Sequence, residues 1–196
     1  MIYAQDTKSS LKAFYYQSLS MKKTIIACLS FSLLLSCKKE VTELPPITQT
    51  GANTFGLKLN GTMWVPRGFA GINDDGLLKA RLLGDVLIIT AQNFSSSPTE
   101  TQFDIHIKGI TGPGTFTFNT NTGYPNDLTT YAYHVKRRLT PLDEWITSAA
   151  QTGSVTVSKL DTSAHIVSGT FQFNAENMLD ASKTISVTEG RFDIKY

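Results

Sequence analysis

Three histidines, His106, His134 and His165, are the side chains of this 196-residue chain best suited to proton transfer or metal binding. Zinc sites usually show in a sequence as pairs of ligands a few residues apart, and no such pair occurs here. We therefore expect no bound metal and no cofactor, and each histidine is interpreted as an exposed or hydrogen-bonded residue of a strand or turn. His106 shares one face of a predicted strand with Asp104 and Lys108, and alternation predicts that this face lies in water.

Paired carboxylates could serve glycoside hydrolysis, which needs two of them about 5 to 10 Å apart across a cleft. Asp143-Glu144 and Asp74-Asp75 are adjacent in sequence, so on a strand their side chains point to opposite faces. The stretch "NDDG" stops too early for an EF-hand and predicts a turn. Serine-hydrolase, zinc-protease and phosphate-loop motifs do not occur in the sequence. We predict no catalytic residues; the alternative is a hydrolase that uses carboxylates such as Asp104 or Glu144.

Aromatic side chains offer a second kind of binding chemistry, a platform on which a sugar ring stacks. The candidates are Trp64, Trp145, Tyr124, Tyr131 and Tyr133. The alternative is that they pack in or beside the core, as large aromatic residues commonly do. We favour core packing.

Cys37 stands at the end of an apolar stretch, directly before charged residues. The order is Met21-Lys22-Lys23, an apolar segment over 24–35, and then the small Ser36. A positive start, a short apolar segment and a small residue at the end are typical of a secretory signal. A membrane-spanning helix is the alternative, but it needs about 20 apolar residues. The apolar segment here is little more than half that long, so the sequence predicts export.

The tetrapeptide Leu34-Leu35-Ser36-Cys37 resembles the lipobox of bacterial lipoproteins. The resemblance implies that signal peptidase II cleaves between Ser36 and Cys37 after the thiol has received a diacylglycerol. Fatty acids such as palmitate then anchor the protein, and two or three acyl chains hold firmly where one does not. The chain accordingly divides into an over-extended start (1–20, with Met21 as the true start), a lipoprotein signal peptide (21–36), the lipidated cysteine with a flexible tether (37–54) and a β domain (55–196).

The charge of the mature chain argues against a nucleic-acid partner. The whole chain has 18 Lys and Arg against 16 Asp and Glu, but four of the basic and one of the acidic residues precede Cys37. The mature chain therefore has 14 basic and 15 acidic residues, a net charge of −1. Nucleic-acid binding rests on clustered Lys and Arg, and the run Lys136-Arg137-Arg138 is interpreted as the solvated end of a strand. Cys28 is lost with the signal and Cys37 is lipidated, so no disulfide is expected.

Beyond Thr54 the chain consists of short predicted strands, because apolar residues recur with period two. The runs over 55–59 and 103–107 show this alternation, and Asn60-Gly61 predicts a tight hairpin turn. Apolar positions change from odd to even numbers between Val187 and Phe192, which predicts a β-bulge. The segment 140–146 fits either a helix start or a strand, and we favour a strand. The fold predicted is all-β: a single antiparallel β-sandwich or a partly closed β-barrel.

Five stretches over most of the mature chain carry a family resemblance: "TGANTFGLKLNGTMWVP", "GPGTF", "GSVTVSKLD", "IVSGTFQF" and "EGRFD". Their order is similar to that in a group of uncharacterised lipoproteins of Bacteroidota that carry a domain of unknown function. The resemblance implies an all-β lipoprotein anchored in the outer membrane, and it brings no catalytic residues. Such bacteria tend to place acidic residues after the lipidated cysteine for surface export. Lys38-Lys39-Glu40 departs from this, so the periplasmic and surface-facing leaflets both stay open.

We expect a non-catalytic binding or structural lipoprotein of the cell envelope. Its partners are the membrane, through the lipid on Cys37, and a protein or glycan that the sequence does not identify. One alternative is a carboxylate-dependent hydrolase of envelope or extracellular polysaccharide. Another is a lipocalin-like carrier of an apolar ligand, which requires a hollow interior, whereas the many inward Phe and Leu residues predict a filled core.

Overall fold

The computed structural model describes residues 42–69, 76–96 and 98–196. All their regular secondary structure is β, so the all-β prediction is confirmed. The strands are β1 (Thr54–Leu59), β2 (Thr62–Trp64), β3 (Leu78–Leu83), β4 (Val86–Ser96), β5 (Thr99–Lys108), β6 (Gly114–Phe118), β7 (Tyr131–Arg137), β8 (Pro141–Ile146), β9 (Gly153–Asp161), β10 (Ile166–Asn177) and β11 (Thr184–Lys195). None of the described segments forms a helix that could span a membrane. The predicted start, signal peptide and Cys37 lie outside the described residues.

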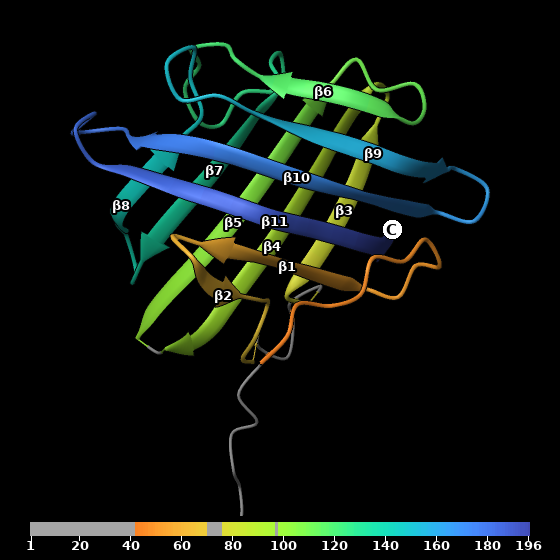
Figure 1. The fold of residues 1–196 in the computed structure, drawn as a ribbon, viewed down its shortest axis with the longest axis horizontal. Coiled ribbons are helices and arrows are strands. Elements are labelled where there is room, and N and C mark those ends of the chain that lie inside the picture. Colours follow the sequence, from red (N-terminus) through yellow and green to blue (C-terminus); the bar gives the residue numbers. More distant parts are fainter. Residues whose placement is uncertain (1–41, 70–75, 97) are drawn as a thin grey trace, which may run out of the picture. The chain divides into compact units, whose positions relative to one another are not determined.

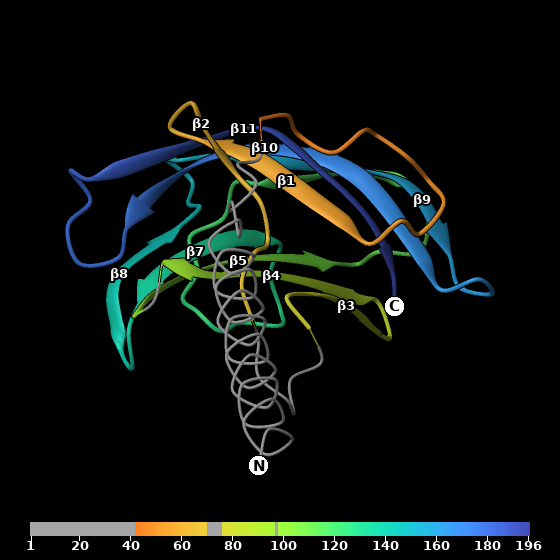
Figure 2. The same cartoon turned by 90° about the horizontal axis from the view of Figure 1, so that it is seen from below.

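The strands form one antiparallel sheet that folds into two layers (Figure 1). One layer has the order β2-β1-β11-β10-β9-β6, and the other has the order β8-β7-β5-β4-β3. β10 joins the layers, because it pairs with β9 along most of its length and with β8 at its end. Figure 2 shows β1, β10 and β11 lying over β4, β5 and β7. β2 and β3 end the path without pairing with each other, so the sandwich is open on that side.

The core fills the space between the layers. Phe103, Ile105 and Ile107 point inward as predicted, and all three are almost fully buried. Aromatic rings from the two layers meet edge to face, with the centroids of Trp64 and Phe103 4.8 Å apart. Every described residue of the main core cluster lies between Phe55 and Ile194. Val41–Tyr196 form one compact unit, and we expect them to fold on their own.

The predicted turn and bulge are both present. Asn60 and Gly61 have φ values of 48° and 81°, as a type I′ hairpin requires. Phe171 pairs with Gly190 and Phe173 with Val187, so β11 has one residue more than β10 over this interval. The extra residue bends the strand and accounts for the switch in apolar positions. The 140–146 segment forms β8, so the strand interpretation is confirmed.

The segment that precedes β1 is bonded to the domain by Asp193 of β11, which is 1% exposed. Its carboxylate accepts hydrogen bonds from N–H and O–H groups of Thr48, Thr50, Gly51, Ala52 and Ser168. Burial alone would raise the pKa of Asp193, but hydrogen bonds from Thr48, Ser168, Thr50 and Gly51 hold that pKa well below its usual range. A buried carboxylate needs such donors, and this segment supplies most of them.

Further contacts fix the same segment. Arg191 donates to the carbonyl of Pro45 over 3.4 Å, and Lys159 donates to the carbonyl of Gln49 over 3.1 Å. A Cβ atom at Gly56 would lie 2.7 Å from Cδ of Pro45, so glycine permits this close approach. The predicted flexible tether covered 37–54, and its described part from Pro45 to Ala52 packs on the domain instead.

Candidate functional site

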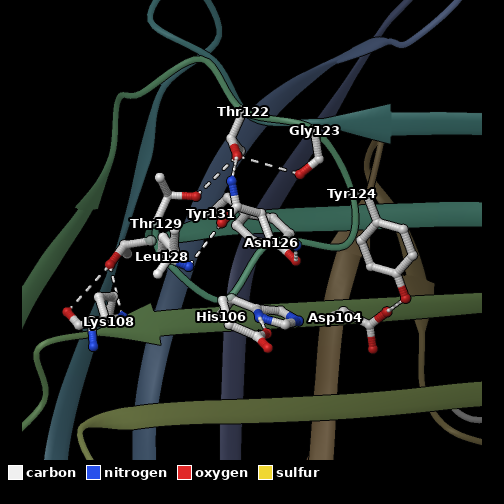
Figure 3. Close-up of polar contacts among 12 residues, drawn as sticks. Asp104, His106, Lys108, Thr122, Gly123, Tyr124, Asn126, Leu128, Thr129 and Tyr131 are labelled. Atoms are coloured by element: carbon white, nitrogen blue, oxygen red, sulfur yellow. Dashed lines mark hydrogen bonds and ion pairs between the residues drawn. The ribbon is translucent and has the colours of Figure 1, made fainter.

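The acid–base candidates of β5 lie on the outward face of the second layer, beneath the segment 119–130 (Figure 3). Asp104 and His106 are only 2% and 5% exposed, so the prediction that they lie in water is wrong. Alternation places them on the outward face correctly, but the connection between β6 and β7 covers that face. Lys108 stays half exposed and pairs with Asp85 over 2.6 Å.

Two tyrosines bind the carboxylates that the hydrolase alternative would use. Oδ2 of Asp104 accepts hydrogen bonds from Nε2 of Gln102 (2.7 Å) and from the hydroxyl of Tyr124 (2.9 Å). The ring of Tyr124 stacks on that of Tyr133 at 3.7 Å, and the hydroxyl of Tyr133 donates to Oε1 of Glu144. Burial, together with the neighbouring carboxylates, raises the pKa of both tyrosines. Both hydroxyls therefore stay protonated and act as hydrogen-bond donors.

His106 lies in the same cluster. Its ring stacks on Tyr131 at 4.5 Å, and its Nδ1 is 3.8 Å from Oδ1 of Asp127. Burial lowers the pKa of His106, and the charges of Asp104 and Asp127 partly offset this effect. Nδ1 of His106 and Oδ1 of Asp104 are buried without a hydrogen-bond partner in the protein, and such atoms are places where water binds. Within the described ranges, no three His, Cys, Asp or Glu side chains are grouped so that they could hold a metal ion.

The other two histidines have different surroundings. His134 of β7 points into the core, where it stacks between Phe103 and Trp145 with centroid distances of 4.1 and 5.3 Å. Its Nδ1 donates to the carbonyl of Gln102 over 2.9 Å. Burial lowers the pKa of His134 to about 4, although this hydrogen bond acts in the opposite direction. His165 lies in the turn between β9 and β10, against Tyr196.

Acid is expected to weaken the domain through His134. An unfolded histidine binds a proton near pH 6.5, whereas folded His134 does so near pH 4. The stability due to neutral His134 is therefore complete above about pH 6.5 and falls as the pH drops toward 4, with about 2 kcal/mol lost between pH 7 and pH 5. His134→Phe keeps a ring between Phe103 and Trp145 but cannot take the proton. Urea unfolding at both pH values should show a smaller loss in this variant.

The variant retains His106, whose pKa is also lowered, so some acid dependence should remain. Equal losses of stability in wild type and His134→Phe would contradict the assignment.

The predicted aromatic residues do not form one platform. Trp64, Tyr131 and Tyr133 are buried, and Trp64 faces the core while the two tyrosines lie on the outward face of β7. The indole N–H of Trp64 donates to Oγ1 of Thr101 over 3.0 Å, so this donor is satisfied within the protein. Trp145 packs against the core in a partly buried position. Packing in or beside the core is therefore confirmed for Trp64 and Trp145, whereas Tyr131 and Tyr133 pack with Tyr124 in a second cluster on the outward face of β7.

A cleft of about 700 Å³ lies on the open side of the sandwich, where the starts of β1 and β3 approach each other. Its apolar lining is Pro45, Phe55, Val65, Pro66, Leu77 and Leu78. Its polar lining is Glu43, Asn53, Thr54 and Lys195. Apolar side chains with polar groups among them form the kind of lining that small-molecule sites use, and here the cleft is open to solvent.

The sheet topology explains why the cleft is there. β2 pairs only with residues 57–59 of β1, so the start of β1 has no neighbour on that side. β3 pairs only with β4. The chain crosses between the layers after β2, and Val65 and Pro66, which follow β2, line the cleft. No pattern in the sequence indicates this site, because its residues come from strand ends and from the segments beside them and carry no chemical motif.

The fold and these sites define an all-β open sandwich with a buried polar cluster and an apolar cleft. Residues 77–193 match a domain of unknown function, DUF6252, and the chain belongs to this family. The match begins just before β3 and ends at Asp193, so β1 and β2 lie outside it. Searches of the curated proteins and of the solved structures gave no match. The prediction that the chain belongs to an uncharacterised family is therefore confirmed, since the matched domain has no known function.

Proposed function

We propose that the protein is a lipid-anchored, non-catalytic binding module of the cell envelope, held in the outer membrane through Cys37. The cleft between β1 and β3 is the observation that carries the binding part of this proposal. The state of the acid–base candidates supports a non-catalytic role. Asp104 is buried and bonded to Tyr124, so it does not face solvent, and Glu144 is partly buried and accepts a hydrogen bond from Tyr133.

The chemistry of the cleft favours an amphipathic ligand. Its apolar walls are aliphatic, proline and phenylalanine side chains, and covering them with an apolar group is favourable. Glu43 and Lys195 supply one charge of each sign to the lining, so a polar or zwitterionic group can be paired there. A lipocalin-like carrier would need space inside the barrel, whereas the interior between the layers is filled by side chains such as Leu57, Ile105 and Phe118.

The anchor and the cleft are close along the chain. Glu43 follows Cys37 by six residues, and an extended chain of that length spans at most about 20 Å. The segment from Pro45 to Ala52 is bonded to the domain, so only a short stretch of chain would separate a lipid on Cys37 from the residues that line the cleft. Amphipathic molecules that leave or enter the membrane are thus the ligands most accessible to this site.

Titration of residues 41–196 with the fluorescent fatty acid cis-parinaric acid tests the proposal. We expect saturable binding, and we expect Leu77→Asp to weaken it by at least about tenfold, because a carboxylate in the apolar wall must be desolvated. Leu83→Asp is the matched control, since Leu83 ends β3, the strand that Leu77 directly precedes, but is 60% exposed and does not line the cleft. Equal effects of the two substitutions, or no saturable binding by wild type, would refute the cleft as the binding site.

A further inference from the structure

One side of β6 is an open sheet edge. This strand pairs with β9 along its whole length, and on its other side it pairs with no described strand. Figure 1 shows β6 as the outermost strand of its layer, beyond β9. Thr115 and Thr117 are exposed, and Phe116 between them is partly buried. An open edge of this kind can pair with a strand of another chain.

The hydrogen-bond pattern of β9 shows which of its residues face β6. The N–H of Asn174, next to β9 on the β10 side, donates to the carbonyl of Thr152. In an antiparallel pair, hydrogen-bonded positions recur at every second residue. The backbone groups of Thr156 therefore face β10, and those of Val155 and Val157 face β6.

The same alternation identifies the free backbone groups of β6. Val155 and Val157 pair with Phe116 and Gly114, so the N–H and C=O groups of Thr115 and Thr117 point to the open side. The hydroxyl of Thr115 lies 2.9 Å from that of the threonine opposite it in β9. This agrees with the assignment, because side chains approach most closely at positions that are not hydrogen-bonded.

The β6 edge lacks the features that block strand pairing at other edges. Open edges are usually protected by charged residues, by proline or by being very short. β3 carries Lys79 and Arg81, β2 has three residues, and the open start of β8 carries Pro141 and Asp143. β6 has neither a charge nor a proline, and the whole stretch 109–125 is uncharged.

The free groups of β6 match a second copy of the same strand. In an antiparallel pair with a two-fold axis beside Phe116, Thr115 of each copy lies opposite Thr117 of the other. Each of these pairs can exchange two hydrogen bonds, about four in all. Phe116, which is partly exposed in one copy, then lies beside its own counterpart at a position where side chains are close together. The uncharged edge brings no like charges together.

We propose that two copies of the chain associate through β6 as a two-fold antiparallel pair, which joins their outer layers into one continuous sheet. Such an interface is isologous, because the same strand serves both partners. The ladder is short, so the dimer is weak and its population rises with protein concentration. This inference goes beyond the proposed function, and it depends on neither the lipid on Cys37 nor the cleft.

Analytical ultracentrifugation of residues 41–196 over a range of concentrations tests the inference. Wild type should show a monomer–dimer equilibrium. Thr115→Lys/Thr117→Lys should weaken association at least about tenfold, because each cross-strand pair then places two lysines opposite each other. Thr115→Glu/Thr117→Glu should do the same. An equimolar mixture of the two variants should associate at least as strongly as wild type, because every such pair then joins a lysine and a glutamate.

Gln172→Lys/Asn174→Lys is the matched control. These two exposed residues have the same spacing and lie on the outer face of the same layer, but in β10, which is paired on both sides. The control should dimerise like wild type, and circular dichroism checks that all variants fold. Wild type that stays monomeric at every concentration would overturn the inference and leave the edge to an extended segment of a different protein. An equal loss in the control, or no recovery in the mixture, would also overturn it.

Discussion

Replacing Asp193 by asparagine is expected to lower the free energy of unfolding of the domain by about 3 kcal/mol. The buried carboxylate accepts six hydrogen bonds. An asparagine keeps one oxygen and replaces the other with an NH₂ group, which donates. Whichever oxygen is replaced, the N–H of Gly51 or those of Thr50 and Ala52 then face another donor. Unpaired buried donors are costly, so the segment before β1 should detach.

Urea unfolding gives the change in stability, and hydrogen exchange shows whether the amides of Thr50, Gly51 and Ala52 lose protection. Asp161→Asn is the control, since Asp161 is a partly exposed aspartate that accepts from the N–H groups of Ser163 and Ala164 in its own turn. We expect a far smaller change there. Unchanged protection of the three amides in Asp193→Asn would show that other contacts, such as that of Pro45 with Gly56, hold the segment.

The pH dependence of the same variant gives an independent check. The folded pKa of Asp193 is depressed, so its contribution to stability is present above the unfolded pKa of about 4 and is lost as the pH falls through the lower folded value. Wild type should therefore lose more stability below about pH 4 than Asp193→Asn does. Parallel losses in the two proteins would contradict this assignment.

The strands could be predicted from the sequence because each layer is buried on the core side. That asymmetry imposes period two on the side chains, as in the alternation of Phe103, Ile105 and Ile107. The bulge near Glu189 was visible for the same reason, since an extra residue shifts the alternation by one. The hairpin turn could be predicted from Asn60-Gly61 because the positive φ values that it needs are confined to these two residues.

Period two shows which residues share a face, but it does not show what covers that face. Asp104 and His106 point away from the core as predicted, yet the segment 119–130 covers them with Tyr124 and its neighbours. That segment is rich in turn-forming residues and has the composition of a solvent-exposed loop. The covering depends on contacts such as that between Tyr124 and Asp104, which are 20 residues apart.

Neither the hydrogen bonds of Asp193 nor the lining of the cleft could be predicted from the sequence, for a related reason. Asp193 occupies an ordinary strand position, and its partners Thr48 to Ala52 are more than 140 residues away in the sequence. The cleft is made from the ends of β1 and β3, which are brought together only by the order of the strands. No local pattern encodes that order, so neither site leaves a signal in the sequence.

Replacing Cys37 by alanine is expected to abolish acylation completely, because a thioether to the diacylglycerol can form only at a thiol. Cys28 is the other cysteine of the chain, and it lies within the apolar segment rather than at the Ser36-Cys37 cleavage site. Cys28→Ala is therefore the matched control and should be acylated like wild type. Metabolic labelling of the full chain with an alkyne fatty acid, followed by gel fluorescence, measures the difference.

The same variant should change where the protein accumulates. With two or three acyl chains, wild type should sediment with the outer membrane, and mass spectrometry should find Cys37 at its N-terminus. Cys37→Ala should remain as uncleaved precursor or appear in the soluble fraction, because signal peptidase II acts only on the lipidated cysteine. A label that persists in Cys37→Ala, or one that is lost in Cys28→Ala, would refute the anchor. The cleft would then have to meet its ligand away from the membrane, and the fatty-acid titration of residues 41–196 would still report on it independently.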